Sequence, residues 1–320
     1  MTSPLIENPV FLVGSERSGS TMLRLMLQHH PLIAFGSEFE FIVTPVSDAK
    51  DAGWPDLGEV RKALELNRIF LKYKLDIDPA LSYPELVRSF LAQILARKPG
   101  NPQVLGATIH YDYHRLPRLW PDARYIHLLR DPRDVARSVI GMGWAGNVWN
   151  ASKVWIKAEQ QWDDLRSQID PSRYTEIRFE DLTANPTEEL TRLCSFLGIP
   201  YDASMLSYPE HSTYDAPDPK LMYQWKRKLS EREVQLVESR LGDVMESRGY
   251  PLSGLPRIAV DAAEQKRLDR QNYWFKVQHR VKFMGLPLFT ADYLARRIAP
   301  RPVRRMVQRR VDALVNANLK

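Results

Sequence analysis

A short run near the N-terminus, FLVGSERSGSTMLRLML, contains the residue types of a phosphate-binding loop. Gly14 and Gly19 stand at the spacing of the G-x-x-x-x-G-K-[ST] motif, and Thr21 fills the last position of that motif. Ser20 occupies the place of the motif's Lys, and Arg17 is the only cation of the loop. The loop therefore predicts an anion site whose positive charge comes from a guanidinium instead of an ammonium group.

This site has donors for a tetrahedral oxyanion but not for a metal-bound nucleotide. A glycine-rich turn that enters a helix directs backbone N–H groups and the positive end of the helix dipole at one point. Arg17 adds a planar fork, and Ser18 and Ser20 add hydroxyl groups. A nucleotide triphosphatase uses the missing Lys and holds Mg²⁺ nearby, whereas the predicted strand 123–129 is followed here by Arg130 and not by Asp. The pattern favours a metal-free anion over Mg·ATP.

A second candidate anion site follows that strand. Arg130 ends the strand, and Ser138 lies one to two turns into the helix predicted for DPRDVARSVIGM. Both side chains can approach an anion at the N-terminal end of this helix. Because the two candidate sites belong to one predicted sheet, we expect a second phosphate at Arg130 and Ser138.

The segments GSERSGSTML and LLRDPRDVARS together resemble the two nucleotide motifs of sulfotransferases that use 3′-phosphoadenosine 5′-phosphosulfate (PAPS). The resemblance implies that the first loop grips the 5′-phosphosulfate, while the Arg and Ser of an R-x7-S pattern grip the 3′-phosphate. RFEDL and LCSFLGIP, common in the bacterial and tyrosylprotein branches, extend the resemblance over about residues 9–250. The nucleotide-binding residues that it implies are Ser15, Arg17, Ser18, Gly19, Ser20, Thr21, Arg130, Ser138, Trp225 and Lys226. Trp225 and Lys226 belong to a segment that is expected to close over the nucleotide.

The catalytic base has two candidates, because the acceptor hydroxyl must lose its proton during transfer. Gly36-Ser37-Glu38 is similar to the Gly-x-Glu of the tyrosylprotein branch, which makes Glu38 the first choice. His110 is the alternative, since it falls at the His of the Lys-Thr-His found in cytosolic small-molecule sulfotransferases. The resemblance also implies that Arg17 is a catalytic cation, which touches the phosphosulfate bridge as charge builds on the departing phosphate.

Thr108 departs from the family pattern, because it stands where the resemblance places a Lys. Lys153, Lys157 or Lys226 are alternatives for stabilising the transferred sulfuryl group. The neighbouring segment HYDYH also offers His110, Asp112 and His114 as metal ligands, but no fourth ligand is apparent. The family resemblance implies a reaction without a metal.

Alternating strands and helices must position these groups. Apolar, β-branched runs predict strands at 9–14, 104–111, 123–130 and 174–179. Helices are predicted after the first loop as far as Pro31, at 59–75, at 84–97, over DPRDVARSVIGM and over NPTEELTRLCSFLG, and a loop is predicted at 200–219. The alternation predicts an α/β fold with a P-loop-like, mostly parallel sheet flanked by helices, as in sulfotransferases.

Composition and charge bound the class of protein. The chain has 320 residues, of which 44% are hydrophobic and 26% charged, as is ordinary for a soluble globular protein. Cys194 is the only cysteine, which excludes an intrachain disulfide and favours a reducing compartment. The N-terminus lacks the pattern of a signal peptide, and no apolar run reaches the roughly 20 residues of a membrane span. We therefore expect a cytoplasmic protein.

The basic charge is concentrated in the C-terminal part of the chain. Residues 257–320 contain 15 Lys and Arg but 5 Asp and Glu, a net charge of +10, so the rest of the chain has a net charge of −4. We predict a sulfotransferase domain at 1–256 and a basic helical extension at 257–320. Apolar residues repeat at helical spacing between arginines in the extension, namely Val303, Met306, Val307, Val311, Leu314 and Val315. Such a helix packs on the body, contacts another copy or lies on an anionic membrane surface.

The predicted activity is metal-free, in-line transfer of a sulfuryl group from PAPS to a hydroxyl or amine of an acceptor. A small molecule, a carbohydrate, a lipid or a peptide all fit as acceptor, and no specific nucleic-acid partner is expected. One alternative is a Mg-ATP-dependent small-molecule kinase with a degenerate phosphate loop. The other is a non-enzymatic binder of polyanions or membrane surfaces that acts through the basic extension.

Overall fold

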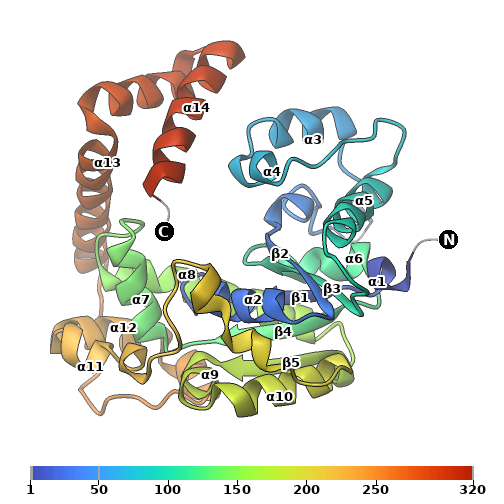
Figure 1. Ribbon diagram of the computed structural model, residues 1–320. Coiled ribbons are helices and arrows are strands. Elements are labelled where there is room, and N and C mark those ends of the chain that lie inside the picture. The colour runs from blue at the N-terminus through green and yellow to red at the C-terminus, as the bar shows by residue number, and fades with distance from the viewer. Residues whose placement is uncertain (1–2, 50, 319–320) are drawn as a thin grey trace. The chain divides into compact units, whose positions relative to one another are not determined.

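A five-stranded parallel sheet forms the centre of the fold in the computed structural model, which describes residues 3–49 and 51–318 (Figure 1). The strands are β1 (Val10–Val13), β2 (Ile33–Glu38), β3 (Val104–Ile109), β4 (Arg124–Leu129) and β5 (Tyr174–Arg178), in the spatial order β2-β3-β1-β4-β5. Every neighbouring pair is parallel. The carboxyl ends of all five strands therefore lie at one edge, where ligands bind in open α/β sheets. The predicted α/β fold with a parallel sheet is confirmed.

Two apolar clusters cover the two faces of this sheet. Val10 and Leu12 of β1 belong to one cluster, with side chains of α2 and α10, whereas Phe11 and Val13 belong to the other, with side chains of α5 and α8. Strands buried on both faces read as continuous apolar runs, which explains why β1 was recognisable in the sequence. The α-helices are α1 (Pro4–Glu7), α2 (Ser20–His29), α3 (Leu57–Leu64), α4 (Arg68–Tyr73), α5 (Tyr83–Ala96), α6 (Leu116–Leu119), α7 (Pro132–Gly141), α8 (Val148–Arg166), α9 (Phe179–Ala184), α10 (Pro186–Leu197), α11 (Trp225–Lys228), α12 (Glu231–Ser247), α13 (Ala262–Ile298) and α14 (Arg301–Asn318).

Two predicted element boundaries need correction. The predicted helix over 59–75 is divided into α3 and α4, because the Asn67 side chain accepts the N–H groups of Ile69 and Phe70 at 3.0 Å each and so starts a new helix. The predicted loop at 200–219 contains two single-turn 3₁₀ helices, η4 (Ala203–Leu206) and η5 (Tyr208–His211), and ends at a third, η6 (Pro219–Leu221). Three further 3₁₀ turns are η1 (Glu40–Ile42), η2 (Tyr113–Arg115) and η3 (Pro171–Arg173).

The described residues form two compact units. The first consists of the residues up to Asp131 together with Val154–Tyr223, and it contains the whole sheet. The second consists of Pro132–Lys153 together with the residues from Gln224 onward. The boundary predicted between residues 256 and 257 lies inside the second unit and stays a prediction.

The C-terminal region is helical, as predicted. In the second unit the first half of α13 packs on the start of α8, where the Asn147 amide donates to the Leu268 carbonyl at 2.8 Å and Trp149 donates to Gln265 at 2.6 Å. The helix kinks at Gly285, whose φ of 73° is not helical. Beyond the kink, α14 packs back along α13 (Figure 1). No helix among the described residues is long and apolar enough to cross a membrane.

Candidate functional site

The loop between β1 and α2 has the backbone of an anion site. Gly14 has a φ of 135°, and a Cβ there would lie 2.5 Å from the carbonyl oxygen of Leu128 on β4. Gly19 has a φ of 97°, and a Cβ there would lie 2.4 Å from the Phe179 ring. Arg17 also has a positive φ, 69°, which is uncommon for a residue with a side chain and is typical of functional loops. The glycine spacing seen in the sequence therefore lets this loop pass close to β4 and α9.

Several hydrogen-bond donors of this loop fit an oxyanion. The first bond within α2 joins the N–H of Leu23 to the carbonyl of Gly19 at 3.2 Å, so the N–H groups of residues 20–22 precede the helical ladder. Gly19 precedes the helix and has no side chain to cap these groups. The Ser18 hydroxyl is 1% exposed and has no hydrogen-bond partner among the described residues. Since buried hydroxyls are normally hydrogen-bonded, the loop fits the phosphosulfate that the sequence implied.

Arg130 lies against this loop at the end of β4. Its side chain is 8% exposed and stacks over the Phe179 ring at 4.1 Å. One guanidinium nitrogen donates to the carbonyl of Arg17 at 3.2 Å, and the other donates to the carbonyl of Leu221 at 2.9 Å. The Trp155 indole in turn donates to the Arg130 carbonyl at 3.1 Å. The two basic motifs found in the sequence thus meet at the carboxyl edge of the sheet.

Three nucleotide-site candidates lie in the second unit, whereas Ser15 and Thr21 belong to the loop and to α2 in the first unit. Ser138 is partly exposed on α7. Trp225 is buried, where its N–H donates to Asp134 at 2.8 Å and its ring lies 3.7 Å from the Arg133 guanidinium. Lys226 is exposed, with its ammonium 5.6 Å from that ring. Trp225 therefore has a packing role within its own unit, and the nucleotide contacts of these residues stay predictions.

His110, just after β3, is bound to the loop through both ring nitrogens. Nδ1 lies 3.0 Å from the Gly14 carbonyl, which only accepts, so Nδ1 carries the proton and donates. Nε2 is then the acceptor for the Ser20 hydroxyl at 3.2 Å. The imidazole is 7% exposed. His110 consequently fixes the position of Ser20 at the start of α2.

Glu38 ends β2 beside this group. It is exposed, and it pairs across the sheet with Thr108 of β3. The carboxylate accepts no hydrogen bond from the described residues, so it is open to a ligand. The Thr108 hydroxyl, at the place of the family's Lys, is buried without a hydrogen-bond partner in the described part of the chain. The structure therefore brings Glu38, Thr108 and His110 together at the same edge as the phosphate loop.

Glu40 belongs to this group but no motif in the sequence singled it out. Its carboxylate accepts the backbone N–H of His110 at 2.9 Å. Burial raises the pKa of Glu40 to about 7, although the nearby imidazole of His110 acts in the opposite direction. Only the three-dimensional pairing of the 38–40 segment with β3 makes this visible, since Glu40 reads as an ordinary surface acid in the sequence.

The lysines proposed as substitutes for the family's Lys lie outside this group of contacts. Lys153 is exposed in the second unit, with its ammonium 3.9 Å from Asp269. Lys157 is exposed on α8 in the first unit. Neither has a hydrogen bond to Thr108, Glu38 or His110 among the described residues. Their predicted role stays untested.

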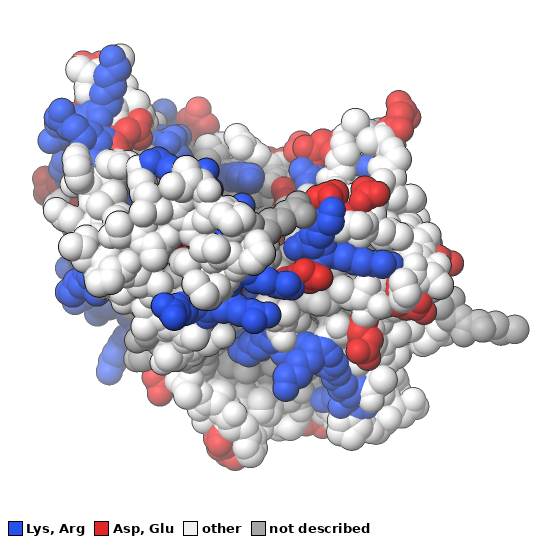
Figure 2. Space-filling model, turned by 90° about the horizontal axis from the view of Figure 1, so that it is seen from above, with Lys and Arg blue, Asp and Glu red and all other residues white. Residues whose placement is uncertain are grey.

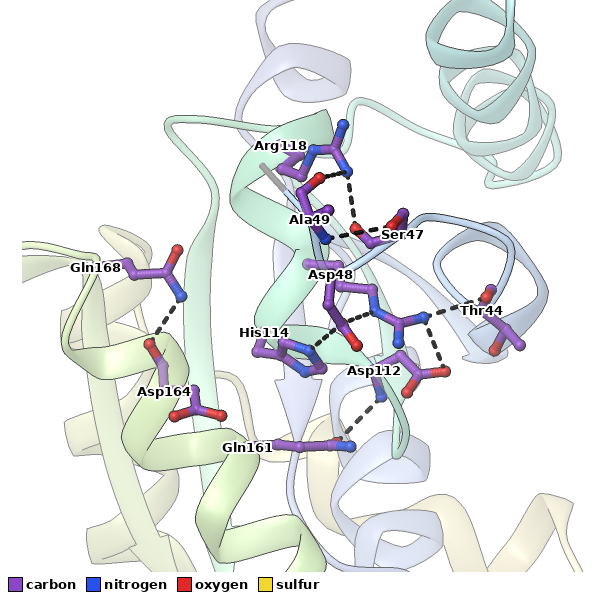
Figure 3. Close-up of polar contacts among 11 residues, drawn as sticks. Thr44, Ser47, Asp48, Ala49, Asp112, His114, Arg118, Gln161, Asp164 and Gln168 are labelled. Carbon is purple, nitrogen blue, oxygen red and sulfur yellow. Dashed lines mark hydrogen bonds and ion pairs between the residues drawn. The ribbon is translucent and has the colours of Figure 1, made fainter. Parts of the chain in front are cut away.

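The HYDYH segment does not gather its candidate metal ligands. His114 lies 2.8 Å from Asp48, which also accepts the Nε–H of Arg115 at 2.6 Å, and the Asp112 N–H donates to Gln161 at 3.1 Å (Figure 3). The hydrogen bonds from Arg115 and His114 lower the pKa of Asp48 to about 2. No group of three or more His, Cys, Asp and Glu side chains suited to a metal occurs in residues 3–49 and 51–318.

Comparison with known proteins assigns the class. A model of the sulfotransferase family matches residues 9–203, and the chain belongs to this family. Its fold is that of the solved sulfotransferase domain from the Synechococcus PCC 7002 olefin synthase, at a TM-score of 0.54 and 24% identity over 80% of this chain and 99% of that one. The predicted family, fold and enzyme class are thereby confirmed, and the kinase and the non-enzymatic binder find no support.

Two curated relatives with different named substrates are similar to this chain in sequence. Protein-tyrosine sulfotransferase 2 of Gallus gallus is 25% identical over 215 residues, which are 63% of this chain and 54% of the relative. The omega-hydroxy-beta-dihydromenaquinone-9 sulfotransferase of Mycobacterium tuberculosis is 25% identical over 175 residues, which are 50% of this chain and 44% of the relative. The chain thus matches about half the length of each of these relatives.

Proposed function

We propose that the protein transfers a sulfuryl group from PAPS to a hydroxyl or amine of an acceptor, by in-line displacement. The observation that carries the proposal is the meeting of the phosphate loop and Arg130 at the carboxyl edge of a sulfotransferase sheet. PAPS supplies the activated sulfuryl group when bound. Arg17 and the N–H groups of residues 20–22 hold the phosphosulfate and stabilise the negative charge that develops on the departing phosphate.

Glu38 is the proposed base. As the acceptor oxygen bonds to sulfur and the sulfur–oxygen bond to the phosphate breaks, the acceptor proton passes to the Glu38 carboxylate and adenosine 3′,5′-bisphosphate leaves. The exposed carboxylate of Glu38 is open to an acceptor. His110, in contrast, has both nitrogens engaged with Gly14 and Ser20. This supports a role for His110 in positioning the loop.

The nucleotide assignment is tested by binding and by transfer. The protein should bind adenosine 3′,5′-bisphosphate in EDTA, and it should transfer label from [³⁵S]PAPS to components of an extract of the source organism. Arg17→Ala and Arg130→Ala should each lower transfer by roughly 100-fold or more, by analogy with the loss of one oxyanion donor. Full activity in both variants, or ATP binding that requires Mg²⁺, would overturn the proposal.

The acceptor and the location are further proposals. One relative is named for protein tyrosine, whose acceptor group is a phenol, and the other for a hydroxylated menaquinone, whose acceptor group is an alcohol. We propose an acceptor hydroxyl of one of these two types, because Glu38 could act as the base for either. We place the reaction in the cytoplasm, on the ground that the single cysteine, Cys194, is buried and free.

We also propose that the C-terminal hairpin, residues 286–310, lies on an anionic membrane surface. Exposed apolar side chains occur on both of its helices, at Leu286, Leu294, Ile298, Val303 and Met306. Exposed arginines accompany them at positions 296, 297, 304, 309 and 310. Figure 2 shows one face of the molecule, on which blue basic side chains border white surface. Apolar groups bordered by cations match the boundary between acyl chains and anionic headgroups.

A further inference from the structure

A cavity of about 460 Å³ lies along β2, within the first unit. Arg24 and Gln28 of α2 line it on one side, Lys72 of α4 on another, and Arg97 and Lys98 follow α5. Four of the lining residues are therefore cations, and none of them is Asp or Glu. This cavity is built from residues that the nucleotide motifs do not include.

The four cations of this cavity have no carboxylate of the described residues within ion-pair distance. Arg24 donates to the Gln28 side chain at 2.9 Å. Arg97 donates to the carbonyls of Tyr73 and Lys74, at 2.6 and 2.9 Å, and Lys98 donates to two carbonyls at the end of α2. None of the four forms an ion pair with a carboxylate among residues 3–49 and 51–318. These neutral partners satisfy hydrogen bonds but do not neutralise the positive charge, and Glu38 is a nearby carboxylate whose charge acts on Arg24.

The lining of the cavity ends one residue before the proposed base. Gly36 and Ser37 line it, and the next residue of β2 is Glu38. The Ser37 hydroxyl donates to the Tyr73 hydroxyl at 3.0 Å, which joins α4 to this end of the strand. The Glu38 carboxylate and the Arg24 guanidinium also lie near enough for their charges to interact. A molecule seated in the cavity would therefore have atoms beside Glu38.

We propose that this cavity is the subsite for an anionic group of the acceptor, a carboxylate or a phosphate ester, whose hydroxyl is presented to Glu38. The inference rests on the proposed function. A single oxyanion is much smaller than the cavity, and Phe35, Tyr73 and Ile94 supply apolar lining for the carbon part of the acceptor. The loop residues proposed to hold the phosphosulfate do not line the cavity, so its cations are available to the acceptor and not to the nucleotide.

The charge of the acceptor can be measured before its identity is known. The protein labels an extract of the source organism with [³⁵S]PAPS, the labelled products are isolated, and mild acid removes the sulfuryl group. The released acceptors are then applied to an anion exchanger at pH 8. We expect the main acceptor to bind the exchanger after desulfation. A main acceptor that passes through uncharged would overturn the inference while leaving the sulfotransferase function intact.

Two variants test the cavity itself, with the most strongly labelled extract fraction as acceptor. Lys72→Met removes the charge of an exposed side chain. Arg24→Met removes the charge of a partly buried side chain and replaces it with an unbranched apolar one. Each should raise the apparent KM for the fraction about tenfold, with the KM for PAPS and the Kd for adenosine 3′,5′-bisphosphate unchanged. Lys62→Met, on α3 outside the cavity, is the matched control and should change none of these values.

The outcomes separate the two hypotheses. Unchanged acceptor KM in both cavity variants overturns the inference. Loss of nucleotide binding in Lys72→Met would also contradict it, because the cavity would then serve the nucleotide. Absence of any PAPS-dependent labelling by the unmodified protein would overturn the proposed function, and the inference with it.

Discussion

Three side chains at the ends of β2 and β3 have different roles, namely those of Glu38, Glu40 and His110. Glu38 is open to a ligand, His110 binds the loop, and Glu40 accepts the N–H of His110 from behind. A carboxyl group that titrates near neutral pH next to an imidazole makes this part of the site sensitive to pH.

The raised pKa of Glu40 predicts how stability changes with pH. The folded pKa of about 7 lies above the ordinary value of 4.5, so the folded state holds the proton more tightly than the unfolded state. The stabilisation is complete below about pH 4.5 and is lost as the pH rises through 7, at a cost on the order of 3 kcal/mol. In urea unfolding, the free energy of unfolding of the unmodified protein should therefore fall more between pH 5 and pH 8 than the free energy of unfolding of Glu40→Gln. Equal losses in the two proteins would contradict this prediction.

The division of roles between Glu38 and His110 is tested by kinetics. Glu38→Gln removes a base while keeping the shape of the side chain, and it should lower kcat by about 100-fold or more. His110→Asn can still donate to Gly14 but does not reach Ser20, so we expect it to raise the KM for PAPS and to lower kcat less. Steady-state rates with varied PAPS measure both effects. The opposite ranking of the kcat losses would make His110 the base.

Site residues that belong to a local sequence motif could be predicted from the sequence, whereas residues brought to the site by non-local packing could not. The glycine spacing and Arg130 could be recognised because loop backbone and strand ends impose local patterns. Glu40, and the cavity cations Arg24 and Lys72, carry no such pattern. Their environment arises from the pairing of β2 with β3 and the packing of α4 and α5, which are non-local contacts.

At the scale of elements, the buried contacts of α7 explain why the second unit holds together. Arg133 of α7 forms an ion pair with Glu238 of α12 at 2.7 Å, and both side chains are almost fully buried. Glu238 also accepts the N–H and the hydroxyl of Ser253, at 2.9 and 2.8 Å. Asp134 meanwhile accepts the N–H groups that begin α11. The carboxylate of Glu238 is thus the polar centre of this unit.

Removing that charge should be strongly destabilising. Glu238→Gln removes the carboxylate of a buried ion pair while the Arg133 guanidinium stays charged and buried, which costs about 3–5 kcal/mol. Asp243→Asn is the control, because Asp243 and its partner Arg257 are exposed and such pairs contribute little. Urea unfolding of the two variants checks the contrast. Comparable losses of stability would mean that the buried ion pair has no special role.

Strand prediction failed at one element for a physical reason. β2 offers an apolar run of only Ile33–Phe35 before Gly36, too short to stand out, and Pro31 marks the end of α2 instead. It is held by pairing with β3, where the missing side chain of Gly106 leaves room for the Phe35 ring. β1, β3 and β4 were predicted because burial along nearly their whole length gives them largely apolar sequences. The edge strand that carries the proposed base was therefore the one that needed the structure.

At the scale of the whole molecule, the C-terminal region combines a docked part and an exposed part. The first half of α13 is fixed by hydrogen bonds to residues 146–149. The hairpin beyond Gly285 buries Val307 but leaves Ile298 78% exposed, and Val311, directly after it on α14, is buried as well. The apolar stripe read from the sequence is thus used partly for packing within the hairpin, and the remainder faces outward among arginines. Exposed apolar groups of this kind mark interaction sites.

The membrane proposal predicts vesicle binding that depends on both charge and apolar side chains. In a flotation assay, the full chain should bind vesicles of equal parts phosphatidylglycerol and phosphatidylcholine more strongly than vesicles of phosphatidylcholine alone. Binding should weaken at high salt, since salt screens the charge of the arginines. The double variant Leu294→Glu, Ile298→Glu should lower binding about tenfold and keep its affinity for adenosine 3′,5′-bisphosphate. Leu66→Glu, at an exposed leucine between α3 and α4, is the control and should bind vesicles normally. If the full chain instead forms a dimer that the double variant loses, and floats with neither kind of vesicle, a second copy occupies the hairpin and the membrane proposal fails.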